Sequence, residues 1–154
     1  MGYPSGVTAL HLDRQLCFAL YSASRATTAA YRPLLDQIGL TYPQYLVLLV
    51  LWEEKQVTVR RLGERLHLDS GTLSPLLKRL EAIGFVQRRR SAADERSVEI
   101  TLTESGRELE SQAQCIPENL FGASGLSVSE IENLRDAVQA LTQALRDVGT
   151  SADS

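Results

Sequence analysis

The stretch from Asp69 to Leu102 constrains the fold of this chain more than any other part of the sequence. It opens with D-S-G-T-L-S-P-L-L-K-R-L-E-A-I-G-F, a segment of helix length whose first turns carry small polar residues. It continues as V-Q-R-R-R-S-A-A-D-E-R-S-V-E-I-T-L, which is rich in arginine and typical of a two-stranded ribbon. A helix fits the major groove of DNA, and a basic ribbon beside it reaches the neighbouring groove or the backbone. The pattern therefore indicates a fold suited to double-stranded DNA.

The charge distribution along the chain favours the same interpretation. The 154 residues carry a net charge of −3. The window from Arg60 to Arg96 has nine basic and five acidic residues and is +4, whereas the remainder has seven basic and 14 acidic residues and is −7. A basic face on an acidic protein is typical of a polyanionic partner. A solvated surface of uneven charge is the alternative for the cluster taken alone.

Bulk properties narrow the class of protein. No run of about 18 apolar residues is present, so no membrane span is expected. Residues 1–8 lack the pattern of a signal peptide, and we expect a cytoplasmic protein. Two cysteines, Cys17 and Cys115, are not a structural disulfide framework in that compartment. His11 and His67 have no ligand residues at metal-binding spacing, so no metal site is expected. No cofactor and no catalytic constellation are expected either.

Glycine, proline and turn residues divide the chain into helices and one hairpin. Apolar residues at steps of three and four predict a long first helix, and Gly39 marks its end. Pro75 is expected to loosen or bend the start of its helix, and Pro117 to break the helix before it. The N-terminal eight residues and residues 149–154 are expected to be disordered. The expected elements are helices over 11–38, 42–54, 59–66, 71–83, 103–116 and 128–148, and strands over 85–89 and 97–102.

Sequence signals also indicate how these helices begin. Thr41 or Tyr42 lies near the cap of the second helix, and Pro43 suits a first turn. Thr58 and Thr103 open later helices, and S-V-S-E at 127–130 reads as a capping box. A basic loop over 90–96 joins the two strands.

This order of elements predicts a mainly α fold with a small β-hairpin wing, in a single domain over residues 1–154. A winged helix-turn-helix over 41–102 is expected to bind DNA, and the helices over 9–40 and 103–148 to form a dimerisation part. These helices carry more apolar surface than one winged helix can cover. A twofold dimer places its recognition helices about one DNA turn (~34 Å) or a multiple of it apart, which predicts a palindromic operator. A monomer whose ends pack on the body is the alternative.

Three groups of residues are expected at the DNA. Small side chains at the start of the second helix of the pair allow close approach to bases or phosphates, and two basic residues follow them. In the loop, Arg96 is expected to enter a minor groove, with Asp94 holding its guanidinium extended through a bidentate pair. Three arginines of the first strand are expected to contact the backbone. The full set is Ser70, Thr72, Ser74, Lys78, Arg79, Arg88, Arg89, Arg90, Asp94 and Arg96.

Cys17 lies on a helical stripe that also carries Tyr21 and Tyr31. Tyrosine hydroxyls donate hydrogen bonds to a thiolate and favour its charged form. Tyr31 is 14 residues from Cys17, about 21 Å along a helix, so it cannot reach its own Cys17 unless the helix breaks. If Tyr31 polarises a cysteine, that cysteine belongs to another chain. An inert cysteine in the core is the alternative.

Four segments resemble the MarR family of winged-helix transcription factors, and within it the organic hydroperoxide resistance regulators. They are L-C-F-A-L-Y-S-A-S-R at 16–25, T-Y-P-Q-Y at 41–45, L-D-S-G-T-L-S-P-L-L-K-R at 68–79 and D-E-R-S-V at 94–98. The resemblance implies a dimeric repressor that releases its operator when an organic hydroperoxide oxidises a cysteine matching Cys17. It also implies that tyrosines matching Tyr31 and Tyr42 hydrogen-bond that sulfur from the other subunit. Because it has a cysteine at position 115, the chain resembles the branch of these regulators whose second cysteine forms an intersubunit disulfide.

Such a switch would work through two chemical steps. A thiolate attacks the peroxide O–O bond to give a sulfenic acid, which condenses with a second thiol. Phe18, Leu20 and the apolar run over 46–51 are expected to line the site and to favour alkyl or lipid hydroperoxides over hydrogen peroxide. Two alternatives stay open: a repressor released by a non-covalent phenolic ligand, and a thiol peroxidase. The peroxidase would need no basic wing. Cys115 as an ordinary buried residue is also open.

Overall fold

The computed structural model describes residues 10–151, with side chains described to Val148. It divides between Ile116 and Pro117 into two compact units, and each is considered by itself. The expected disorder of residues 1–8 and 152–154 lies outside the described residues. The same expectation for residues 149–151 is wrong, because helix α7 continues to Ser151. Among the helices of residues 10–151, none combines the length and apolar character that a bilayer span requires.

The first unit begins with a short 3-10 turn and a long helix, where one helix from residue 11 was expected. The turn η2 spans Leu12–Arg14, and helix α1 spans Leu16–Asp36. Gln15 between them is extended, with φ −84° and ψ 111°, so α1 starts five residues later than predicted. The chain leaves α1 through Gly39, whose φ of +70° suits glycine, close to the predicted end.

Helix α2 (Tyr42–Glu54) begins as predicted. The Thr41 hydroxyl accepts from the Gln44 backbone N–H at 3.4 Å, and the Gln44 side chain accepts from the Thr41 N–H at 2.8 Å. Pro43 lies in the first turn, where no backbone hydrogen bond is lost. Seven of the 13 residues of α2 are buried, so this helix belongs to the core of the first unit.

Helices α3 (Val59–Leu66) and α4 (Ser70–Ala82) form the helix-turn-helix. The Thr58 hydroxyl accepts from the Arg61 N–H at 3.1 Å, and the Asp69 carboxylate accepts from the Thr72 N–H at 2.7 Å. Both caps satisfy N–H groups that a helix start leaves without partners. Helix α4 runs from Ser70 to Ala82 with Pro75 inside it, so this proline does not end the helix.

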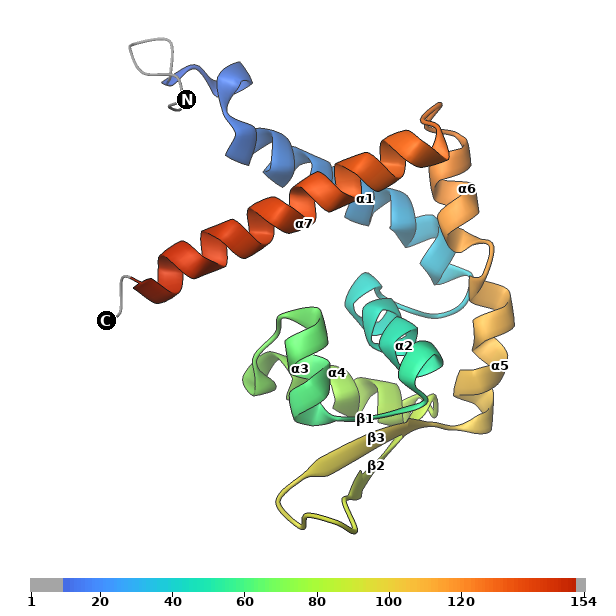
Figure 1. Ribbon diagram of the computed structural model, residues 1–154. Helices are drawn as coiled ribbons and strands as arrows, with labels where there is room; N and C mark the ends of the chain where they lie inside the picture. Colours follow the sequence, from blue (N-terminus) through green and yellow to red (C-terminus); the bar gives the residue numbers. More distant parts are fainter. Residues whose placement is uncertain (1–9, 152–154) are drawn as a thin grey trace. The chain divides into compact units, whose positions relative to one another are not determined.

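A three-stranded antiparallel sheet follows the order β1-β3-β2. Strands β2 (Val86–Arg90) and β3 (Val98–Leu102) form the expected hairpin, each starting one residue later than predicted. Val86 pairs with Leu102 at its base, and Arg90 pairs with Val98 toward its tip. The hairpin extends away from the helices as a wing (Figure 1). Strand β1 (Gln56–Thr58), which sequence reasoning missed, pairs with the other edge of β3.

The core of the first unit is built on α2 and α4. Of the four leucines of α4, Leu73, Leu77 and Leu80 are fully buried and Leu76 is half-buried. Ile100 of the wing is fully buried as well, so the hairpin is anchored in the same core. The largest fully buried side chains include Tyr45, Leu48, Leu51, Leu62, Leu73, Leu77, Leu80 and Ile100.

The chain after the wing differs from the prediction. Helix α5 (Glu104–Ala113) starts at the expected cap, where the Thr103 hydroxyl accepts from the Gly106 N–H at 3.1 Å. It ends at Ala113 rather than Ile116, and α6 (Ile116–Gly122) follows after two residues. Pro117 therefore lies in the first turn of α6 and does not break α5. A proline fits there because its missing N–H has no helical partner at that position.

The second unit contains the long helix α7 (Val128–Ser151). The predicted capping box is confirmed: the Ser127 N–H donates to Glu130 Oε2 at 2.8 Å, and the Glu130 N–H donates to Ser127 Oγ at 3.3 Å. One stripe of α7 is apolar at alternating steps of three and four, the spacing of a helix-packing seam. Its members, which we call the α7 seam, are Ile131, Leu134, Val138, Leu141, Leu145 and Val148. Leu134 and Leu145 are 59% and 58% exposed in the single chain.

Candidate DNA-binding face and redox site

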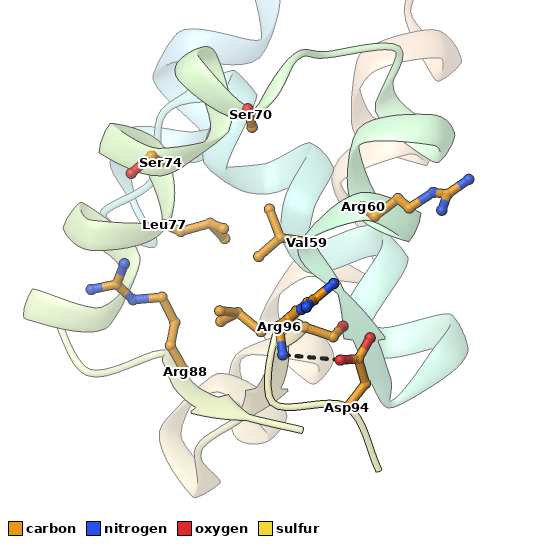
Figure 2. A pocket seen from close by; sticks show the side chains of 10 residues that line it. Val59, Arg60, Ser70, Ser74, Leu77, Arg88, Asp94 and Arg96 are labelled. Carbon is orange, nitrogen blue, oxygen red and sulfur yellow. Dashed lines mark hydrogen bonds between the residues drawn. The ribbon is translucent and has the colours of Figure 1, made fainter. Parts of the chain in front are cut away.

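A groove of about 490 Å³ lies between α3, α4 and the wing. The start of α3 and the first two turns of α4 form one side, and the end of the wing loop forms the other (Figure 2). Leu77 and Val59 contribute apolar surface, whereas Ser70 and Ser74 contribute hydroxyls (Figure 2). The groove is lined by Val59, Arg60, Ser70, Ser74, Leu77, Arg88, Asp94, Arg96, Ser97 and Val98. Two of the segments predicted to read DNA are therefore brought together.

The polar and basic residues predicted on the second helix are all exposed on α4. Asp69 fixes the start of this helix, and the hydrogen bond from the Thr72 backbone N–H holds the pKa of the Asp69 carboxyl below its usual range. The cap is therefore charged at neutral pH. The exposed residues are Ser70, Thr72, Ser74, Lys78 and Arg79.

The wing turn is closed by backbone contacts rather than by the expected side-chain pair. The Ser91 N–H donates to the Ser97 carbonyl at 2.8 Å, and the Ser97 N–H donates to the Asp94 carbonyl at 2.9 Å. Asp94 Oδ1 accepts from the backbone N–H of Arg96 at 3.0 Å (Figure 2). The bidentate pair predicted between Asp94 and the Arg96 guanidinium is thus wrong. Asp94 shapes the turn in the way typical of an Asx turn.

Arg88 makes a structural contact that sequence reasoning missed. Its Nε and Nη2 donate to Glu81 Oε2 at 2.9 and 2.7 Å, and its backbone N–H donates to Glu81 Oε1 at 3.2 Å. The Arg88 side chain is the main cause that holds the pKa of the Glu81 carboxyl below its usual range. This pair joins the end of α4 to the first wing strand. The sequence held a signal for this pair, because the turn at Gly84 separates the oppositely charged Glu81 and Arg88.

Ion pairs divide the nine basic residues of the window from residue 60 to 96 into two groups. Arg60 pairs with Glu64, Arg88 pairs with Glu81, and two further arginines of α3 pair with the end of α2. Those two are Arg61, which contacts Glu54 at 3.1 Å, and Arg65, which contacts Glu53 at 2.7 Å and Glu54. Within residues 10–148, the basic residues of this window that form no ion pair are Lys78, Arg79, Arg89, Arg90 and Arg96. All five belong to the predicted DNA-contacting set.

A cluster of tyrosines joins the end of α1 to the start of α2. The ring of Tyr31 lies 4.8 Å from that of Tyr42 and 5.7 Å from that of Tyr45. Burial, with smaller contributions from Tyr45 and Tyr42, raises the pKa of Tyr31 to about 12. Burial also raises the pKa of Tyr42. These hydroxyls therefore stay protonated at neutral pH and remain hydrogen-bond donors.

Cys17 is exposed in the first turn of α1, away from this cluster. Helix α1 is continuous from Leu16 to Asp36, so the 14 residues between Cys17 and Tyr31 span about 21 Å. The structure thus brings Tyr31 and Tyr42 together and leaves Cys17 of the same chain apart from them.

Helix α1 also carries a hollow that begins at the residue after Cys17, although Cys17 itself does not line it. This hollow of about 420 Å³ is lined by Phe18, Tyr21, Ser22, Arg25 and Ala26. The Arg25 guanidinium lies 5.5 Å from the centre of the Tyr21 ring. Of the residues expected to line the redox site, Phe18 borders this hollow, whereas Leu20 and residues 46–51 do not. The run over 46–51 belongs to α2 and is largely buried in the core.

Cys115 is also exposed, in the turn between α5 and α6. Its thiol donates a weak hydrogen bond to the Gln112 carbonyl at 3.8 Å. Neither cysteine is a small core residue of this chain, so that alternative is wrong for both. Among the described residues, no cluster of three or more His, Cys, Asp or Glu side chains is placed to hold a metal ion.

A helix-turn-helix followed by an antiparallel hairpin, with unpaired cations on the second helix and the hairpin, defines the class of winged-helix DNA-binding proteins. Comparison with known proteins gives the family. Residues 29–112 match the family model described as transcriptional regulator SarA/Rot. The chain is 49% identical over 136 residues to the organic hydroperoxide resistance transcriptional regulator of Bacillus subtilis, covering 88% of this chain and 92% of that protein. It is 52% identical over 134 residues to the HTH-type transcriptional regulator TtmR of Methylorubrum extorquens, covering 87% and 69%.

Solved structures agree with these matches. Reduced AbfR bound to DNA is 40% identical with a TM-score of 0.75, and the match covers 89% of this chain and 94% of that one. AbfR, from Staphylococcus epidermidis, is also solved in a disulfide-formed state, which is 42% identical with a TM-score of 0.59 over 85% and 92% of the chains. The chain described here belongs to the MarR family of winged-helix transcriptional regulators, in its organic hydroperoxide resistance group.

Proposed function

We propose that this chain is a repressor that binds a palindromic operator as a homodimer and releases it when an organic hydroperoxide oxidises Cys17. One observation carries the proposal: Cys17 is exposed in the first turn of the unbroken helix α1, whereas Tyr31, which contacts Tyr42 of α2, lies near the other end of α1. The two parts are complementary, since the cluster offers hydroxyl donors and a thiolate accepts them. They meet when the α1 helices of two chains pack antiparallel.

Exposed apolar side chains support the dimer. Leu16 and Phe18 on α1 are 48% and 40% exposed, and Leu134, Leu145 and Val148 of the α7 seam are exposed in the single chain. Apolar surface of this kind, arranged along helices, marks an interface between proteins. We assign dimerisation to residues 9–40 and 103–148, and DNA binding to residues 41–102. The five unpaired cations supply phosphate and groove contacts from the second of these parts.

The chemical step is balanced by the peroxide itself. The Cys17 thiolate attacks the outer oxygen of R–O–O–H, the O–O bond breaks, and the alkoxide leaves with a proton as the alcohol. The resulting sulfenic acid condenses with the thiol of Cys115 from the other chain, which forms a disulfide and releases water. A disulfide requires Cα atoms about 4.4–6.8 Å apart, so a wider resting separation forces the helices to move. Each protein consumes its peroxide once, as a sensor and not as an enzyme.

Operator binding tests this function directly. We expect cumene hydroperoxide to weaken binding of the wild-type dimer by about 5- to 150-fold, the usual range of coupling between two sites. Cys17→Ser is expected to bind normally and to stay bound. Cys115→Ser is expected to lose the disulfide but to form the sulfenic acid. Salt must be held fixed, because phosphate contacts make affinity steeply dependent on ionic strength. Release of Cys17→Ser by the peroxide would disprove the mechanism, and its release by a phenolic acid would favour a ligand sensor.

The wing makes a separate prediction. Arg96 lines the groove and forms no ion pair within residues 10–148, so its guanidinium is available to a minor groove. We expect Arg96→Ala to weaken specific binding by about 1–3 kcal/mol, measured by fluorescence anisotropy on the operator. Arg135→Ala, an exposed arginine of α7 paired with Asp136, serves as the control and should change little. Equal affinities for Arg96→Ala and wild type would remove the wing from the mechanism.

A further inference from the structure

Aromatic side chains continue from the tyrosine cluster along the whole of α2. Tyr42 starts the helix, its ring lies 6.4 Å from that of Tyr45, and the Tyr45 ring lies 6.2 Å from that of Trp52 in an edge-on arrangement. Tyr45 and Trp52 are 2% and 7% exposed. From Tyr42 to Trp52 the helix spans about 15 Å. One buried helix thus carries a cluster residue at its start and an indole near its end.

The indole of Trp52 is bonded to the base of the wing. Its Nε1 donates to the carbonyl of Gly106, in the first turn of α5, at 2.9 Å. Gly106 in turn packs against the backbone of Phe85, and the Thr103 N–H donates to the Phe85 carbonyl at 3.1 Å. The Thr103 hydroxyl donates to the Gly84 carbonyl at 2.5 Å. We call Gly84, Phe85, Thr103 and Gly106 the wing root, because β2 begins and β3 ends there.

We propose that Trp52 is a positioning residue that couples the tyrosine cluster to the wing root, so that its indole N–H sets how far oxidation at Cys17 changes DNA affinity. The inference rests on the proposed function. Helix α2 is apolar and buried on most sides, so a shift at Tyr42 moves its far end rather than bending the helix. The buried indole N–H must keep its acceptor, since an unpaired buried donor is strongly unfavourable. Movement of α2 is therefore passed to Gly106 and the wing strands.

Trp52 is the only tryptophan of the chain, which allows a test that changes a single group. Growth on benzothienylalanine replaces the N–H of every indole by sulfur. In this protein the change occurs only at position 52. Growth on 5-fluorotryptophan keeps the N–H and serves as the matched control. Operator affinity is measured for each full-length protein in the reduced state and after cumene hydroperoxide, at fixed salt. Mass spectrometry confirms equal oxidation of Cys17.

The readout is the ratio of oxidised to reduced dissociation constants. We expect the fluorotryptophan protein to keep the wild-type ratio and the benzothienylalanine protein to lose about three- to tenfold of it, the range of one hydrogen bond. A decrease of this ratio by less than threefold overturns the proposal. Equal weakening of DNA binding in both states has the same meaning, because a purely structural role leaves the ratio unchanged. If the control protein itself does not release its operator, the proposed function fails instead. Leu48→Val, which removes buried volume from α2 but no hydrogen bond, should also keep the ratio.

Discussion

Leu134→Glu combined with Leu145→Glu is expected to convert the proposed dimer to monomers and to lower operator affinity by about 100-fold or more. The two leucines lie on the α7 seam and are more than half exposed in the single chain, so their replacement leaves the fold of the monomer intact. In a dimer interface, each glutamate would place a charge in an apolar contact, which is costly without a partner. Loss of the second recognition helix removes an avidity of about 10²–10⁴.

Light scattering gives the mass, and anisotropy on the operator gives the affinity. The control carries the same added charge on the polar side of α7, as Asn133→Glu with Ala140→Glu, two exposed positions seven residues apart. The control should remain dimeric and bind normally. A dimeric Leu134→Glu, Leu145→Glu protein with wild-type affinity would show that the α7 seam is not the interface.

The helix starts of this fold were predictable because their causes are local. Thr41, Thr58, Asp69 and Thr103 each accept a hydrogen bond from the N–H three residues later. Such contacts depend on a few consecutive residues, and the sequence contains them complete. The hairpin was predictable for a similar reason, since the alternation of β3 lies within the hairpin and Gly84 lies just before it.

Other features depended on distant partners. Strand β1 has three residues and exists because Gln56 to Thr58 pair with residues 99–101, more than 40 positions later. Pro117 was assigned to the end of one helix although it fits the first turn of the next, and both positions are compatible with a proline. No local signal distinguishes the two.

The site shows the same division. Helical spacing alone separates Cys17 from Tyr31, and the unbroken α1 agrees with that arithmetic. The ion pairs of Arg61 and Arg65 could not be predicted, because their partners at the end of α2 are set by tertiary packing. The role of Trp52 was missed for the same reason: its acceptor lies 54 residues away, on a helix that carries no sequence signal for it.

Gly106→Ala is expected to lower the free energy of unfolding by about 3 kcal/mol, at the upper end of the range for overpacking a core. A Cβ at this position would lie 2.1 Å from the Phe85 carbonyl oxygen and 3.2 Å from Leu102 Cδ2. The nearer atom belongs to the backbone of the wing root, which the Thr103 N–H already holds at 3.1 Å. Relief of the clash therefore separates α5 from β2 and pulls the Gly106 carbonyl away from Trp52.

Urea unfolding followed by the fluorescence of Trp52 measures this change, at one protein concentration because a dimer is stabilised by mass action. Gly122→Ala is the control, since a Cβ there meets no atom within 4 Å. In a helix this second change should be neutral or slightly stabilising, because alanine has less backbone freedom to lose than glycine. If Gly106→Ala unfolds within about 1 kcal/mol of the wild type, the wing root is looser than its distances indicate, and a rigid link through it to the DNA-binding wing is lost with it.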